Sequence, residues 1–118
     1  MGRRRVKLFL DSCIVIYLVE RVEPWRTRIE EALFVADWDR LVISDLVQLE
    51  CLIRPYKMAD IPAEGAFRRY FAGCDTAPIQ ASTFDLAAHL RADHGLKTPD
   101  AIHLAAALES GCAELWDE

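Results

Sequence analysis

Apolar and polar positions follow one another in blocks along the chain, and these blocks predict strands that alternate with helices. Short runs rich in β-branched and aliphatic residues predict strands at residues 5–10, 41–43 and 113–116, with a short strand or a connection at 77–79. Longer segments whose apolar residues recur at helical spacing predict helices at residues 13–20, 24–36, 44–54, 61–73, 81–94 and 98–110. This alternation predicts a three-layer α/β/α sandwich, an α/β fold with a short central parallel sheet.

Residues with strong positional preferences mark the helix ends. Ser44 is suited to cap the third predicted helix, and Pro55 is expected to stop it at about residue 54. Gly95 occupies the usual C-terminal position after the fifth helix. Thr98 is expected to cap the last helix, with Pro99 as its first residue.

Length and composition indicate one soluble globular unit. The 118 residues are enough for a single domain spanning 1–118, and 53% hydrophobic with 28% charged residues is ordinary for such a protein. The longest apolar run, residues 14–19, is far shorter than a membrane span of roughly 20 residues. Lys7 and Asp11 interrupt the apolar run near the N-terminus, which does not fit a secretory signal. We therefore expect a cytoplasmic protein without a membrane contact.

Charge and cysteine content exclude two further classes. A net charge of −5 argues against a general nucleic-acid coat, which would be basic, but leaves room for acids that bind metal. The four cysteines lie far apart without metal-binding spacing, so we expect small core residues rather than a disulfide or zinc framework.

Glu50 is the acid that is hardest to explain structurally. Together with Leu46, Leu49 and Ile53 it forms one stripe of the third helix, which predicts that its carboxylate faces the core or the edge of the core. An unpaired charge there is costly, so a compensating partner is expected. That partner is an arginine such as Arg91, or a metal ion, unless Glu50 reaches water at the edge of the stripe.

Two further acids stand at the ends of predicted elements. Asp11 follows the first strand, where it either caps the next helix or contributes to a site at the carboxyl edge of the sheet. Asp100 lies in the first turn of the last helix, where the helix dipole alone would account for it. One common site explains all three acids more economically, because Mg2+ and Mn2+ prefer oxygen ligands and would relieve the repulsion among converging carboxylates.

Three segments carry a resemblance to a known family: Phe9-Leu10-Asp11-Ser12, residues 44–50, and Leu96-Lys97-Thr98-Pro99-Asp100-Ala101-Ile102-His103-Leu104-Ala105. They resemble PIN domains, in particular the VapC-type toxins of prokaryotic toxin–antitoxin pairs, over nearly the whole chain. The resemblance implies a Mg2+- or Mn2+-dependent endoribonuclease that acts on RNA, forms a homodimer and is neutralised by a cognate antitoxin. Asp11, Glu50 and Asp100 match the three central acids of this family and are the expected catalytic and metal-binding residues.

The C-terminus departs from the family pattern, which continues after the last strand to a fourth acid. Here the last strand is followed by Asp117-Glu118. Either one of these two residues substitutes as the fourth metal ligand, or the fourth ligand is missing. The second case favours an alternative function, a catalytically weak PIN-like module that acts by binding a protein partner. Ser12 and Thr98 either assist the site or serve as plain caps. We expect His103 to be a packed helix residue outside the catalytic set.

Overall fold

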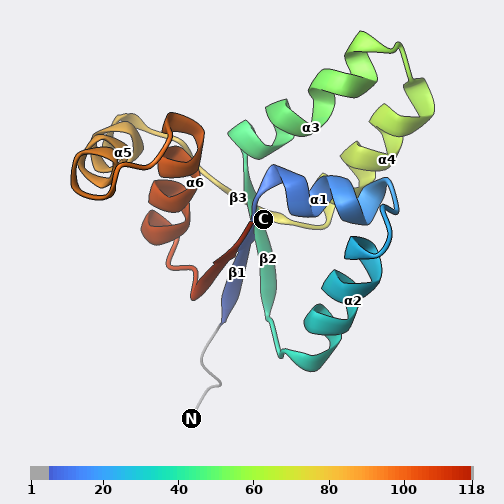
Figure 1. The fold of residues 1–118 in the computed structure, drawn as a ribbon, viewed down its shortest axis with the longest axis horizontal. Coiled ribbons are helices and arrows are strands. Elements are labelled where there is room, and N and C mark those ends of the chain that lie inside the picture. Colours follow the sequence, from blue (N-terminus) through green and yellow to red (C-terminus); the bar gives the residue numbers. More distant parts are fainter. Residues whose placement is uncertain (1–5, 118) are drawn as a thin grey trace.

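A computed structural model describes residues 6–117 and contains a central parallel sheet of four strands in the order β3-β2-β1-β4 (Figure 1). The strands are β1 (Lys7–Leu10), β2 (Arg40–Ser44), β3 (Asp75–Ala77) and β4 (Glu114–Trp116). In the register, Phe9 of β1 pairs with Val42 of β2 on one side and with Leu115 of β4 on the other. The expected α/β fold with a short parallel sheet is confirmed.

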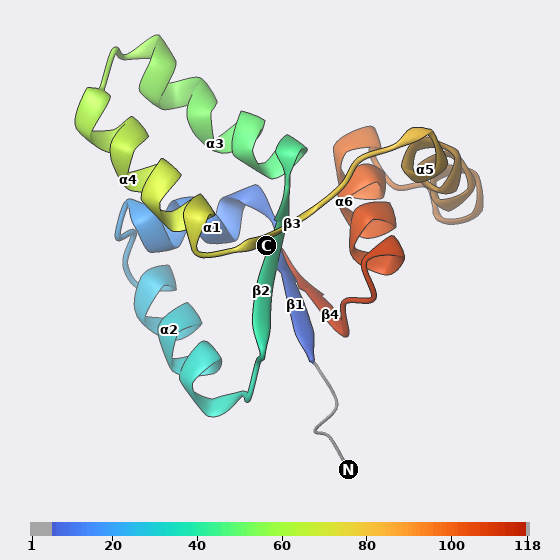
Figure 2. The ribbon, with the colours of Figure 1, turned by 180° about the vertical axis from the view of Figure 1, so that it is seen from behind.

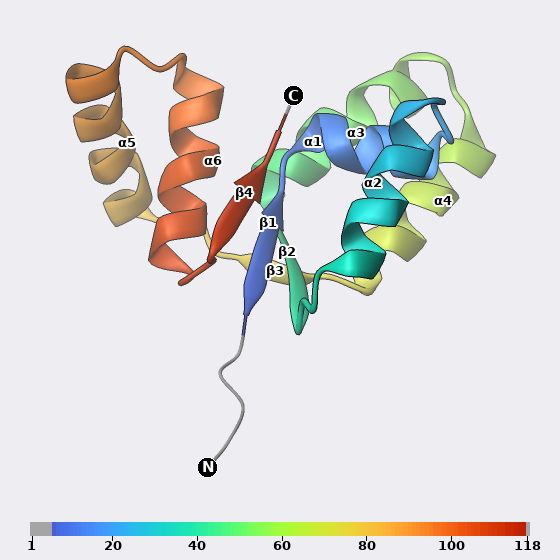
Figure 3. The same cartoon turned by 60° about the horizontal axis from the view of Figure 1, so that its bottom comes forward.

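Six helices cover the two faces of this sheet (Figures 2 and 3). They are α1 (Ser12–Val19), α2 (Trp25–Val35), α3 (Asp45–Lys57), α4 (Ile61–Ala72), α5 (Ala81–His94) and α6 (Thr98–Glu109). The first four helices lie on one face, whereas α5 and α6 lie on the other, because the chain reverses its direction across the sheet after β3. None of the helices within residues 6–117 is long and apolar enough to cross a membrane.

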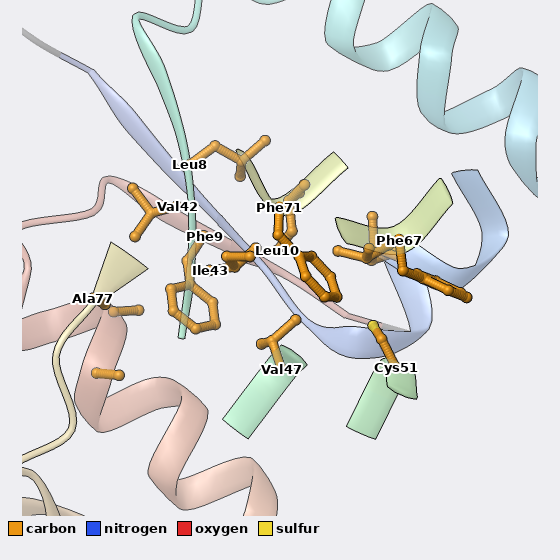
Figure 4. Close-up of a cluster of buried hydrophobic side chains, with 14 of the residues drawn as sticks. Leu8, Phe9, Leu10, Val42, Ile43, Val47, Cys51, Phe67, Phe71 and Ala77 are labelled. Atoms are coloured by element: carbon orange, nitrogen blue, oxygen red, sulfur yellow. The ribbon is translucent and has the colours of Figure 1, made fainter. Parts of the chain in front are cut away.

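The main core lies between the sheet and helices α1, α3 and α4 (Figure 4). Leu8, Phe9 and Leu10 of β1 are fully buried, as expected for a central strand covered on both faces. Phe67 of α4 and Cys51 of α3 complete this layer. A smaller cluster holds α5 and α6 together through Ala87, Ala101, Ile102 and Ala105, with five half-buried neighbours.

The third helix differs from the sequence prediction in its length. Ser44 caps it as expected, since its hydroxyl accepts a hydrogen bond from the Val47 amide at 3.3 Å. Pro55, however, lies inside the helix, which continues to Lys57. A proline inside a helix costs one backbone hydrogen bond and a steric clash, but Pro55 is buried on the face of α3 that turns inward. Tertiary packing thus outweighs the local preference of proline to end the helix.

The third helix also differs in the face that it turns inward. Its buried residues are Val47, Cys51, Leu52 and Pro55. Leu49 and Ile53, which the stripe of apolar positions placed toward the core, are each 57% exposed. That prediction was wrong because α3 carries two apolar faces, and periodicity does not indicate which of them meets the sheet.

Smaller differences concern element ends. The third strand occupies residues 75–77 rather than 77–79, and Lys97, rather than Thr98, is the N-terminal cap of α6. Gly95 ends α5 with a positive φ of 67°, as predicted for a C-terminal glycine.

Candidate metal centre

The candidate site lies at the carboxyl edge of the sheet, where β1 and β2 lead into α1 and α3 (Figure 1). Asp11 directly follows β1, and its amide donates a hydrogen bond to the carbonyl of Trp116 at the end of β4. Its carboxylate caps α1: Oδ1 accepts hydrogen bonds from the Cys13 amide at 3.3 Å and from the Ser12 hydroxyl at 3.0 Å. Both hydrogen bonds end on Oδ1, so Asp11 is a helix cap and still presents Oδ2 as a ligand oxygen.

Glu50 is brought to the same place by α3. Its side chain is 27% exposed, and its Oε1 lies 2.8 Å from Nε2 of His103 on α6. Arg91, one of the alternative partners for Glu50, instead donates its Nε to the Leu96 carbonyl. The group that compensates Glu50 is therefore an imidazole from the opposite layer of the sandwich.

His103 joins the two acids. Its side chain is 2% exposed, and Nε2 lies 3.9 Å from Oδ1 of Asp11 as well as close to Glu50. One ligand atom from each of Asp11, Glu50 and His103 can be chosen so that all three atoms lie within 4.8 Å of one another. The two carboxylates at this spacing offer the oxygen donors that Mg2+ and Mn2+ prefer, and His103 holds one of them in place.

His103 was expected to be a packed helix residue outside the catalytic set. It is packed, but its contact with Glu50 was not part of that expectation. Its ring lies 6.0 Å from that of Phe9, and Nδ1 has no hydrogen-bond partner within residues 6–117. The available signal was its position three residues after Asp100, which places both side chains on neighbouring parts of one helix surface. The need of Glu50 for a partner was a second signal.

The acids of the site influence a neighbouring thiol. Burial, together with the smaller effect of the negative charges of Glu50 and Asp11, raises the pKa of Cys51 to about 12. Cys51 remains protonated and donates its Sγ hydrogen to the Ser12 carbonyl at 3.8 Å. The negative field at this edge is what a bound cation would neutralise.

Asp100 and Asp117 lie outside the group of three. Asp100 is exposed in the first turn of α6, a helix that runs back from the carboxyl edge of the sheet toward the start of β4. It therefore lies at the expected edge, one helical turn before His103. Asp117 follows Trp116 and lines an apolar groove with Tyr17 and Trp25 between α1 and α2. Glu118, the other candidate for a fourth acid, lies outside the described residues.

Comparison with known protein families decides the assignment. The profile of the PIN domain matches residues 8–117, which run from the second residue of β1 to the end of the described chain. The chain belongs to the PIN domain family. Among curated proteins, none matches the sequence significantly.

Solved structures similar to this PIN domain come from toxin–antitoxin systems. A toxin–antitoxin complex from Klebsiella pneumoniae contains a chain with 21% identity and a TM-score of 0.74, covering 94% of this chain and 86% of that chain. VapC20 from Mycobacterium tuberculosis, described as a toxin that cleaves the sarcin-ricin loop, has 14% identity and a TM-score of 0.76, with coverages of 94% and 88%. VapBC2 from Rickettsia felis, solved with a promoter DNA fragment, has 12% identity, a TM-score of 0.74 and coverages of 96% and 88%. At these identities the likeness shows a shared fold.

Proposed function

We propose that this PIN domain is a Mg2+- or Mn2+-dependent endoribonuclease and the toxin of a VapBC-type toxin–antitoxin pair. The observation that carries the proposal is the convergence of Asp11, Glu50 and His103 at the carboxyl edge of the sheet. Membership of the PIN family supports it, as do the toxins among the similar structures. A cytoplasmic location would give such an enzyme access to RNA.

We expect Asp11, Glu50 and Asp100 to hold the cation. Asp117 lines the groove between α1 and α2, so it serves as the fourth acid only if its carboxylate turns toward this edge of the sheet. Carboxylate oxygens are the donors that Mg2+ and Mn2+ take, and Asp11 keeps Oδ2 free of the two hydrogen bonds that fix Oδ1. A divalent cation held by these residues would supply Lewis acidity toward a phosphodiester and would make a water molecule more acidic.

The residues around the carboxylates act by positioning. The Ser12 hydroxyl and the Cys13 amide hold the carboxylate of Asp11 in one orientation at the start of α1. When Glu50 is ionised its oxygens only accept hydrogen bonds, so Nε2 of His103 is the donor and keeps Oε1 in place. Because an imidazole buried in α6 holds Glu50 on α3, the two layers of the sandwich share one site.

Metal-dependent RNA cleavage by the purified chain tests this proposal. We expect cleavage with Mg2+ or Mn2+, loss of cleavage with EDTA, and loss in Asp11→Asn, because an amide is a poorer ligand than a carboxylate for these cations. Asp60→Asn is a matched control, since Asp60 caps α4 through its contact with the Ala63 amide and is exposed away from the sheet edge. Equal cleavage by wild type and Asp11→Asn at limiting Mg2+ would contradict the assignment.

A catalytically weak module that works by binding a protein is the second candidate function. The position of Asp117 favours it, because this acid lines the groove between α1 and α2 and does not belong to the group of three ligand residues. Absence of cleavage by wild type, combined with tight binding of the operon partner, would support this function over the nuclease.

We propose two protein partners, an antitoxin and a second copy of the chain. An acidic cluster that attracts cations is well suited to bind a basic side chain, and an arginine can pair with carboxylates in a bidentate manner. Co-purification with the product of the adjacent gene tests the antitoxin, and titration of that complex with Mg2+ tests whether metal and antitoxin compete for the cluster.

A further inference from the structure

A groove lined mainly by aromatic side chains lies between α1, α2 and the end of β4 (Figure 3). Its volume is about 500 Å3, which falls within the ~300–1,000 Å3 typical of small-molecule sites. Tyr17 of α1, Trp25 of α2 and Trp116 of β4 contribute its aromatic surface. We refer to it as the α1–α2 groove.

The α1–α2 groove adjoins the acidic cluster. Asp11, Ile14 and Tyr17 follow one another at intervals of three residues, so they lie along one side of α1. Asp11 belongs to the cluster, whereas Ile14 and Tyr17 line the groove. The amide of Asp11 also donates a hydrogen bond to the carbonyl of Trp116, another residue of the groove, at 3.0 Å. An RNA strand with one phosphate at the acidic cluster would therefore place a neighbouring nucleotide at the groove.

Three planar groups of the groove form a row that is suited to stacking. The rings of Tyr17 and Trp25 lie 6.1 Å apart and only 24° from parallel. The guanidinium of Arg28 lies 5.3 Å from the centroid of the Trp25 ring. Trp25 is nevertheless 45% exposed, so part of its aromatic surface faces the solvent. Proteins hold unpaired RNA bases by stacking them on aromatic rings and on the planes of arginine side chains, and this row offers both.

Two charged groups of the groove fit the polar parts of a nucleotide. Arg28 supplies a positive charge for a phosphate in a chain whose net charge is −5. Asp117 supplies a carboxylate, whose two oxygens only accept hydrogen bonds. Guanine presents two adjacent donors, N1–H and the N2 amino group, on its Watson–Crick edge, whereas the other three bases present one donor group there. A carboxylate therefore pairs with guanine through two hydrogen bonds and with the other bases through one.

We propose that the α1–α2 groove holds an unpaired guanine base of the RNA substrate, stacked on Trp25 and hydrogen-bonded to Asp117. The proposal rests on the nuclease function proposed above and deepens it, because it adds a base preference beside the site of cleavage. An apolar segment of a protein partner would be held differently, by burial of apolar area without a requirement for an aromatic face. This difference separates the two occupants experimentally.

Binding of short RNAs in EDTA tests the base preference without cleavage. The probes are labelled pentauridine and its variants with guanosine or adenosine at the third position, and fluorescence anisotropy reports binding. We expect the wild type to bind the guanosine RNA about 10-fold more tightly than the other two, because a bidentate contact discriminates between bases. Asp117→Asn replaces one acceptor by a donor and should abolish this ratio. Equal binding of the three RNAs by the wild type would overturn the proposal.

Two substitutions of Trp25 test the stacking. Trp25→Phe keeps an aromatic face, whereas Trp25→Leu keeps a similar apolar area to phenylalanine without one. We expect Trp25→Leu to weaken binding of the guanosine RNA about 10-fold and Trp25→Phe to retain most of the affinity. Phe34→Leu is the matched control, because Phe34 also lies on α2, is 91% exposed and does not line the groove.

Circular dichroism should show that every variant keeps its helices. Unchanged RNA binding by Trp25→Leu, or an equal loss in Phe34→Leu, would contradict stacking on Trp25. If the Trp25 and Asp117 variants bind RNA like the wild type but Trp25→Leu no longer co-purifies with the product of the adjacent gene, the groove holds the protein partner and the proposal is wrong.

The outcome for the groove can be separated from the outcome for catalysis. A chain that prefers the guanosine RNA in EDTA but does not cleave RNA with Mg2+ or Mn2+ would remove the nuclease function and leave the base site standing. A chain that cleaves RNA, but binds the three RNAs equally, would remove the base site and leave the nuclease function.

Discussion

The substitution Asp11→Asn is expected to change the stability of the protein in opposite directions with and without a divalent cation. Asparagine is as good an N-terminal cap as aspartate, so the hydrogen bond from the Cys13 amide is retained. The substitution therefore removes a charge from the cluster without removing the cap of α1. What remains is the electrostatic interaction with Glu50, and that interaction depends on the metal.

The magnitude follows from the spacing of the ligand atoms. Two like charges separated by the 4.8 Å that bounds this group repel by about 0.9 kcal/mol at the dielectric constant of water and by about 3.5 kcal/mol at an effective value near 20. The side chains of Asp11 and Glu50 are 13% and 27% exposed, between these limits. His103 offsets part of the repulsion, so we expect Asp11→Asn to raise the free energy of unfolding by about 1–2 kcal/mol in EDTA.

The sign reverses once the cation binds. A ligand at 100 times its dissociation constant stabilises the native state by about 2.7 kcal/mol, and the variant forfeits most of this because one ligand oxygen is lost. Urea denaturation followed by far-UV circular dichroism, in EDTA and in saturating Mg2+, measures both values. Asp60→Asn should change stability by less than about 0.5 kcal/mol in both buffers, since it conserves a cap and lies on an exposed helix end. The same stability difference between wild type and Asp11→Asn in both buffers would refute the metal site.

Three further predictions concern a site residue, a buried thiol and a turn. His103→Ala should lower the free energy of unfolding by about 2–4 kcal/mol, because it leaves a cavity where a side chain is 2% exposed and removes a hydrogen bond to Glu50. His103→Gln keeps a hydrogen-bond donor, so it should recover part of this stability in the urea assay and part of the metal affinity in calorimetry. Equal metal affinities of the two variants would exclude the positioning role of His103. Burial raises the pKa of Cys74 from 9.0 to about 11, so the unfolded chain loses the thiol proton at a lower pH than the folded chain. The free energy of unfolding should therefore fall as the pH rises from 9 to 11, by up to about 1 kcal/mol per pH unit. Cys74→Ala should flatten this dependence on pH, and an unchanged dependence would show that the thiol is not responsible. Gly95→Ala should lower stability by about 1 kcal/mol because φ is 67°, whereas Gly73→Ala, at φ −86°, should change thermal stability little; equal shifts in melting temperature would contradict the conformational argument.

Much of the architecture was readable from local sequence. The order of strands and helices follows from apolar periodicity and from residues such as Ser44 and Gly95 whose backbone preferences act within a few positions. The parallel sheet follows from the alternation of those elements, and Asp11 was placed at its carboxyl edge because it comes directly after the first strand. These features depend on neighbours in the chain, and such interactions are visible in the sequence.

The tertiary structure decided which surfaces meet. Periodicity identified the stripe with Leu49 and Ile53, but only the packing of α3 on the sheet showed that this stripe faces outward and that Val47 and Cys51 face inward. In the same way, the sequence singled out Glu50 as an acid in need of a partner, but not His103 as that partner. The two residues are 53 positions apart and reach one another across two layers of the sandwich. Such contacts depend on the free energy of the whole packed arrangement, in which Pro55 can remain helical and a histidine can be both a core residue and part of an acidic site.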